Sequence, residues 1–232
     1  MKPERTFPHR QRGVVLIVTL VILVIITFVG LIAMRTGMLQ VAMSTNSQVS
    51  AVLFQNADAG TIVVENKVNA DPNYANGATG PVTLARDNPG VDIVGCLKKG
   101  TTGLVMSTAV ASPARCDPTQ GADFVSGRGV VVVQVALRAP ADATGNAQVV
   151  KNYGTDDSVL PGGGSVLLAA YSTSVMPNYG SATAGEIKTC LEGAQEATAT
   201  VPSTVTSCLS GKNASFQTVV QEFVYGYGGY QN

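Results

Sequence analysis

The stretch QRGVVLIVTLVILVIITFVGLIAMRTG, from Gln11 to Gly37, contains a long apolar run close to the N-terminus. Between Val14 and Met34 it holds 21 residues without a charge. As an α-helix these residues would reach about 31 Å, which matches the hydrocarbon core of a bilayer. The sequence therefore predicts one helix that can cross a membrane.

The residues around this stretch predict its orientation. Four cations precede it and only Arg35 follows it closely; the four are Lys2, Arg5, Arg10 and Arg12. Positive charge is retained in the cytoplasm, so we expect a cytoplasmic N-terminus and an exported C-terminal part. A cleaved secretory signal is disfavoured, because the apolar block is too long and ends in GLIAMRTG, without the small-x-small pattern of a cleavage site.

Beyond the span the apolar residues change to helical spacing. Polar residues separate the members of this stripe, which are Met38, Ala42, Val49, Val52, Leu53, Ala57, Gly60, Val63 and Val64. Such spacing indicates one face of an amphipathic helix. No proline occurs between Pro8 and Pro72, so a single helix over residues 14–69 is expected.

A basic leader that ends in Gly13, an uncharged span that starts at Val14 and an amphipathic continuation resemble the N-terminus of type IV pilins and pseudopilins. Within that group, RGVVLIVTLVILVIITFVGLIAMRTGMLQVAMSTN followed by FQNADAG is most similar to the PilX-type minor pilins. The resemblance covers residues 10–66. It implies a prepilin peptidase cut between Gly13 and Val14, followed by N-methylation of Val14, where pilins usually carry phenylalanine.

A second departure from the pilin pattern concerns the fifth mature residue, which is Val18 where major pilins carry glutamate. In the family that carboxylate is thought to neutralise the α-ammonium of a neighbouring subunit, since an unpaired charge in an apolar filament core is costly. A subunit with nothing above it needs no such carboxylate. Val18 therefore suggests a position at the filament tip, although a subfamily that tolerates valine anywhere would look the same.

The part beyond the helix, residues 70–232, is rich in strand and turn signals. A core strand is expected at Gly129–Arg138, with Gln134 and Arg138 on the face opposite Val131, Val133, Val135 and Leu137. A second strand is expected at Ser165–Val175. Ser215–Gly228 is a third, with helix an alternative for its first half; PVTLA near Val82 and VDIVGCL near Ile93 are weaker candidates. Glycine and proline clusters such as DPNYANGATGP and MPNYGSATAG mark turns between them.

These signals predict an α+β, pilin-like fold in which the long N-terminal helix packs against an antiparallel β-sheet. The expected divisions are a cleaved leader (1–13), the transmembrane half of the helix (14–34), its amphipathic half (35–69) and a globular domain (70–232). Without the leader, 11 basic and 14 acidic residues remain, a net charge of −3. Nothing in that balance attracts nucleic acid.

Four cysteines, Cys96, Cys116, Cys190 and Cys208, lie on the exported side of the predicted span. An even count in an oxidising compartment predicts disulfides. Local pairing would join Cys96 to Cys116 and Cys190 to Cys208; two other pairings remain open at this point. The resemblance favours a Cys190–Cys208 bond, because pilins often staple a C-terminal loop. A four-cysteine zinc site is disfavoured because no C-x₂-C spacing occurs.

Catalysis, metals and cofactors are not expected. The one histidine, His9, lies in the leader, which leaves the mature chain without an imidazole. Asp156 and Asp157 lack the later ligands of a calcium loop, and Gly162–Gly164 lacks the lysine of a phosphate loop. Three tyrosines lie close to the C-terminus: Tyr225, Tyr227 and Tyr230. We expect them to pack at the edge of the sheet rather than to form an adhesive or DNA-stacking surface.

By this resemblance the chain is expected to be a minor pilin that helps prime assembly of type IV pili and sits at or near the tip. Its partners would be major and other minor pilins, the prepilin peptidase, the assembly platform, inner-membrane lipid before assembly and, as a further candidate, a tip adhesin. It would sit first in the inner membrane and then in the extracellular pilus. The alternatives are a type II secretion pseudopilin and an unprocessed, membrane-anchored binding protein.

Overall fold

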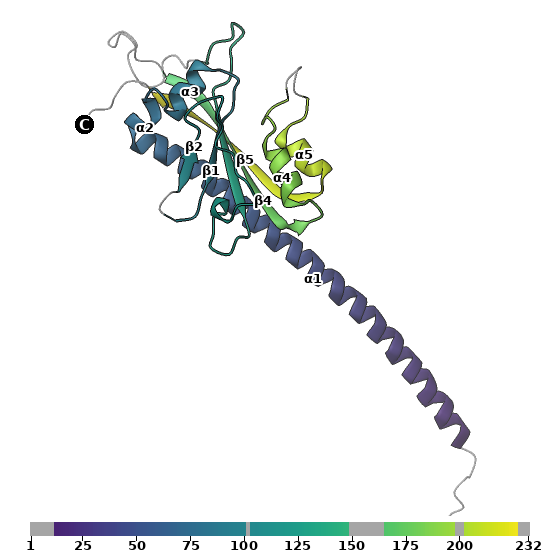
Figure 1. Cartoon of the computed structure of the whole chain (residues 1–232). Helices are drawn as coiled ribbons and strands as arrows, with labels where there is room; N and C mark the ends of the chain where they lie inside the picture. Colours follow the sequence, from purple (N-terminus) through teal and green to yellow (C-terminus); the bar gives the residue numbers. More distant parts are fainter. Residues whose placement is uncertain (1–11, 101–102, 149–164, 198–201, 227–232) are drawn as a thin grey trace, which may run out of the picture. The chain divides into compact units, whose positions relative to one another are not determined.

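A computed structural model describes residues 12–100, 103–148, 165–197 and 202–226 of the chain (Figure 1). The chain divides into two compact units, Met1–Val49 and Ser50–Asn232. The helix α1, Arg12–Ala70, contributes residues to both units. The single helix that the sequence predicted over residues 14–69 is therefore present.

The second unit is built on a five-stranded antiparallel sheet with the order β2-β1-β3-β4-β5. Its strands are β1 (Ile93–Leu97), β2 (Leu104–Met106), β3 (Val132–Arg138), β4 (Ser165–Gly180) and β5 (Ala214–Gly226). Together with the long helix, this sheet confirms the predicted α+β class. All three principal strand predictions and the weaker one near Ile93 are confirmed, while the three-residue β2 was not predicted.

Short helices occupy several segments that the sequence indicated as strand or turn. They are α2 (Pro72–Asn76), α3 (Pro81–Asp87), a 3₁₀ turn η2 (Gly121–Asp123), α4 (Ala184–Leu191) and α5 (Val205–Gly211). The strand prediction for PVTLA is wrong, because Pro81 begins α3, where its fixed φ and missing N–H suit the first turn. The turn predicted at MPNYGSATAG is shorter than expected, since β4 continues to Gly180.

One face of the sheet is covered by α1. Every third or fourth residue on the packed side of the helix is buried: Leu53, Ala57, Gly60, Val64 and Val68. The Oγ of Ser174 on β4 donates a 2.6 Å hydrogen bond to the carbonyl oxygen of Leu53. The predicted stripe is thus correct from Leu53 onward, whereas Met38, which lies in the other unit, is 74% exposed.

The opposite face of the sheet, on which the sequence places Gln134 and Arg138, is also covered. Gln134 is buried because α4, α5 and the segment around Cys116 form a second layer, and Arg138 is buried against Asp92 and Glu196. An apolar cluster fills the space between that layer and β3 and β4; it contains Val132, Val175, Ile187, Leu191, Val205 and Leu209. Burial on both faces explains why all seven residues of β3 are inaccessible.

Candidate functional site

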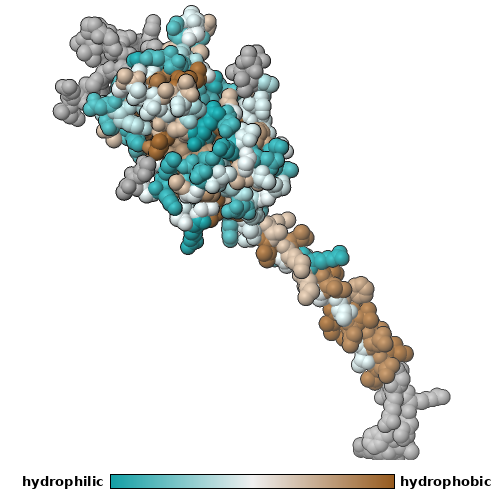
Figure 2. Space-filling view, in the orientation of Figure 1, coloured by the Kyte–Doolittle hydropathy of each residue, from teal (hydrophilic) through white to brown (hydrophobic). Residues whose placement is uncertain are grey.

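The first candidate surface is the exposed apolar part of α1, residues 15–34, which we call the apolar segment. Figure 2 shows its hydrophobic side chains gathered along the helix. They range from 42% exposed at Val24 to 69% at Met34. A water-soluble surface rarely exposes so large an apolar area, so this segment needs lipid or protein around it. It is long and apolar enough to cross a membrane, and no other helix in the described residues is.

The polar groups of the apolar segment are satisfied within the helix itself. Thr19 donates its hydroxyl to the carbonyl oxygen of Leu16 at 3.0 Å, and Thr27 donates to that of Val24 at 2.7 Å. Hydroxyls bonded in this way no longer need water, and a continuous helix pairs its own backbone groups. The segment is therefore suited to an apolar surrounding, as a single-pass membrane anchor requires.

The predicted processing residues lie at the start of α1. Gly13 and Val14 follow Arg12, the first helical residue, and nothing further is described for their side chains. Val18, the residue on which the tip hypothesis rests, is 48% exposed. Whether the chain is cut before Val14 remains a prediction.

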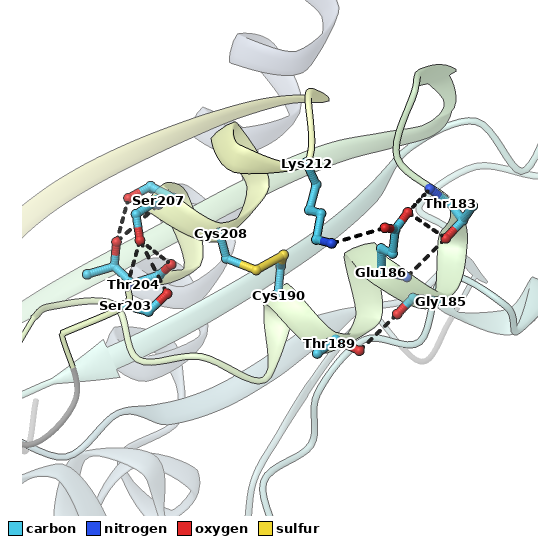
Figure 3. The surroundings of a disulfide bond; sticks show 11 residues. Thr183, Gly185, Glu186, Thr189, Cys190, Ser203, Thr204, Ser207, Cys208 and Lys212 are labelled. Atoms are coloured by element: carbon cyan, nitrogen blue, oxygen red, sulfur yellow. Dashed lines mark hydrogen bonds and ion pairs between the residues drawn. A yellow bond between two sulfur atoms is a disulfide. The ribbon is translucent and has the colours of Figure 1, made fainter.

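The second candidate surface is the C-terminal disulfide region, which we define as Thr183–Lys212. The Cys190–Cys208 bond joins α4 to α5 (Figure 3). Cys190 belongs to the apolar cluster, and Cys208 packs against it. A second bond joins Cys96 on β1 to Cys116. Of the three pairings that the sequence left open, the structure contains the local one. No cysteine is free, and no group of three or more metal-ligating side chains occurs within the described ranges.

Both helices of the C-terminal disulfide region begin with reciprocal caps (Figure 3). At α4 the Thr183 hydroxyl accepts from the backbone N–H of Glu186, whose carboxylate accepts from that of Thr183. At α5, Thr204 and Ser207 exchange equivalent bonds. The Nζ of Lys212 lies 3.2 Å from the Glu186 carboxylate and ties the end of α5 to the start of α4.

Substituting the α4 cap gives the first test of this region. Thr183→Ala removes the acceptor for the Glu186 N–H, so we expect the free energy of unfolding to fall by about 1 kcal/mol. Urea unfolding of the full chain in detergent micelles measures the change. Thr189→Ala is the control, because that hydroxyl is exposed and donates only to the Gly185 carbonyl within α4. Equal losses in both variants would contradict a capping role.

Ion pairs connect the C-terminal disulfide region to the segment that follows Cys116. The Nζ of Lys188 on α4 lies 2.7 Å from an Asp117 carboxylate oxygen. Hydrogen bonds from Lys188 and Thr119 lower the pKa of Asp117 from its ordinary 3.8 to about 2. The buried Asp123 accepts from the Asp117 N–H and pairs with Lys98 at 2.7 Å. These bonds fix the position of α4 beside the loop.

The lowered pKa of Asp117 predicts an acid-dependent loss of stability. A carboxylate with a lower pKa in the folded chain stabilises it above the unfolded pKa, near 4, and this stabilisation is lost as the pH falls through about 2. We expect Asp117→Asn to lower the free energy of unfolding at pH 6 and to have less effect at pH 2.5. Urea titrations of both proteins at these values provide the comparison, and an equal difference at both pH values would contradict the assignment.

Two buried polar groups that join distant parts of the fold were not predicted. The Gln134 side chain accepts from the Cys116 N–H at 3.1 Å and donates to the Leu191 carbonyl at 2.8 Å. Arg138 pairs with Asp92 at 3.2 Å and with Glu196 at 3.5 Å. In the sequence, each is a polar residue within a valine-rich strand. That pattern does not distinguish a buried polar side chain from one that faces solvent.

Of the remaining residues that the sequence analysis considered for binding or catalysis, the structure describes only Tyr225. Tyr225 is buried, and its hydroxyl accepts a 2.8 Å hydrogen bond from Asn76 Nδ2, so this tyrosine packs inside the fold. The others lie outside the described residues: His9, Asp156, Asp157, Gly162, Gly163, Gly164, Tyr227 and Tyr230.

Comparison with known proteins gives one match. Residues 12–61 match the model of the PilX N-terminal family. The matched residues contain the apolar segment and the first residues of α1 that pack on the sheet, including Leu53, Ala57 and Gly60. No curated protein and no solved structure matches the chain. The N-terminal part is therefore similar to that of PilX-type type IV pilins, a family of structural proteins rather than enzymes.

Proposed function

We propose that this chain is a minor pilin, a structural subunit that helps prime type IV pilus assembly and is incorporated into the filament. The observation that carries the proposal is the exposed apolar segment within residues that match the PilX N-terminal family. Such a segment has two compatible surroundings, the lipid of a membrane and the apolar helices of sister subunits.

The proposed mechanism exchanges one of these surroundings for the other. While residues 1–13 remain, four cations hold the N-terminus on the cytoplasmic side. Cleavage between Gly13 and Val14 removes those charges, and methylation of Val14 follows. The span can then leave the bilayer and pack among other subunits' helices, because no charged side chain between Val14 and Met34 opposes the transfer.

The two disulfides support export of the second unit to an oxidising compartment. The proposed path therefore runs from the inner membrane, with a periplasmic C-terminal part, to the extracellular pilus. The partners along it are the prepilin peptidase, the assembly platform and other pilins, with a tip adhesin as a further candidate. Roles in adhesion or motility would follow from the filament.

A tip position is the finer part of this proposal and rests on Val18. A subunit with no neighbour above it has no α-ammonium to neutralise, so it can lack the usual carboxylate. Immunogold labelling of sheared pili should then mark filament ends. Label spread evenly along the filaments would contradict the tip position while leaving the pilin assignment in place.

Mass spectrometry of sheared filaments tests the function itself. The chain should be present in filaments from a strain with the prepilin peptidase and should be restricted to the membrane in a strain without it. Restriction to the membrane in both strains would support the unprocessed anchored protein. Dependence on a type II secretion system instead of the pilus platform would identify the chain as a pseudopilin.

A further inference from the structure

Among the described residues, no strand pairs with the outer edge of β5, the last strand of the sheet. The hydrogen bonds of β4 show which backbone groups of β5 point toward this edge. The N–H of Leu167 donates to the Gln148 carbonyl at 3.0 Å, on the side of β4 that faces away from β5. In an antiparallel ladder a non-hydrogen-bonded pair turns its backbone groups outward on both strands. Leu167 pairs with Val224, so the Val224 N–H and C=O point away from β4.

The direction of the backbone groups alternates along a strand, so every second residue of β5 points its N–H and C=O away from β4. The residues whose backbone groups point outward are Phe216, Thr218, Val220, Glu222 and Val224. Within the described part of the chain, none of the five has a backbone hydrogen bond to a segment other than β4. Val220, in the middle of the row, is 52% exposed, whereas its neighbours on β4 are largely buried.

The sequence of β5 lacks the features that normally protect an exposed edge. Proteins blunt such edges with lysine, proline, bulges or very short strands. β5 is thirteen residues long, ASFQTVVQEFVYG, and contains no lysine, arginine or proline. Its one charge is Glu222, and the ladder with β4 is regular from Ser165 to Val175. A regular, weakly charged edge of this length is a template for strand pairing.

We propose that this edge binds a β-strand contributed by a different subunit of the pilus assembly, which adds to the sheet as a sixth strand. The proposal rests on the minor pilin function above and names a surface through which the subunit joins its neighbours. Donors and acceptors that recur at every second residue are matched by an extended backbone. An α-helix, whose backbone groups are already paired, cannot satisfy them.

The direction of α1 argues against a second copy of this chain. Along the sheet, Leu53 of α1 contacts Ser174, the partner of Gln217, while Glu65 bonds to Gln221. The α1 residues and β5 therefore run in the same direction. If two copies paired their β5 strands in antiparallel fashion, residue 50 of one copy would lie at the opposite end of the joint sheet from residue 50 of the other. Two chains anchored in one membrane need these residues at the same end, because both helices continue from there toward the membrane.

Hydrogen exchange of the wild-type chain tests the pairing directly. Amides of the five outward residues should exchange rapidly in the isolated full chain in detergent and at least tenfold more slowly in sheared filaments. Protection already present in the isolated chain would show that another segment of this chain covers the edge, and would overturn the proposal. Rapid exchange in filaments would also overturn it. Absence of the chain from filaments would refute the proposed function instead.

A backbone variant with a matched control gives an independent readout. Val220→Pro removes one outward N–H at a position where an edge strand tolerates proline, while Val220→Thr keeps the N–H and a branched side chain. The proline variant should enter filaments at least tenfold less, relative to its amount in the membrane, and the threonine variant should match wild type. A folded proline variant that enters normally would overturn the proposal. Photo-crosslinking from position 220 that gives only homodimers would do the same.

Discussion

Replacing Gly60 by leucine is expected to lower the free energy of unfolding by about 3 kcal/mol, because α1 approaches the sheet most closely at this residue. A Cβ atom at Gly60 would lie 2.2 Å from Ser172 Oγ and 3.0 Å from Val133 Cγ1. Leucine has no room beyond that atom, so the helix must move away from β3 and β4. The contacts of Ala57 and Val64 with the sheet would weaken with it.

Three further substitutions separate crowding from other effects of a substitution in a helix. Gly185→Leu in α4 is the control, because nothing lies within 4 Å of a Cβ built there. Gly60→Ala adds only the Cβ atom, and a second substitution, Ser172→Ala, should restore much of the stability that it loses. The Ser172 hydroxyl is buried without a hydrogen-bond partner among the described residues, and its removal makes room. Urea unfolding of the full chain in micelles measures all of them. Unchanged stability in Gly60→Leu would contradict the close approach.

Removing the Cys190–Cys208 bond should have an effect of similar size. The bond closes a loop with a sequence separation of 18 residues, for which the chain-entropy model gives about 3 kcal/mol. The two helices that it joins are short, seven and eight residues, and cover β3 and β4 on the face opposite α1. Cys190→Ala with Cys208→Ala should therefore expose that layer to proteolysis before the rest of the second unit.

The control for this variant is Thr189→Ala with Ser210→Ala, two exposed positions within two residues of the cysteines. Limited proteolysis followed by mass spectrometry would locate the first cuts, and urea unfolding would give the change in stability. The cysteine variant should be cut first within Thr183–Lys212. Identical cleavage of both variants would show that the caps and the apolar cluster hold the region without the disulfide.

Local patterns were sufficient to predict the long helix. An uncharged run, a stripe of apolar residues at helical spacing and the absence of proline over residues 9–71 all act within α1. The same holds for β3, β4 and β5, whose branched and aromatic residues favour strands. At Pro81 the pattern was ambiguous, because five residues are too few to separate a strand from a helical turn.

Contacts between distant segments could not be predicted in this way. Gln134 is polar within an apolar strand, and its burial depends on two distant segments, the one around Cys116 and the helix α4, which begins fifty residues later at Ala184. The cysteine pairing depends on which Cβ atoms the fold brings together, and sequence spacing alone allows three answers. The edge position of β5 likewise follows from the order of the strands in the sheet. The residues of β5 themselves do not indicate which strands lie beside it.

In the proposed mechanism, the apolar segment leaves the membrane for a filament once the leader is removed. The most direct test is the intact mass and N-terminal fragment spectrum of the chain recovered from sheared filaments. We predict a chain that begins at Val14 with a methylated amine and contains both disulfides. A filament-associated chain that still carries Met1 and the residues through Gly13 would contradict the account.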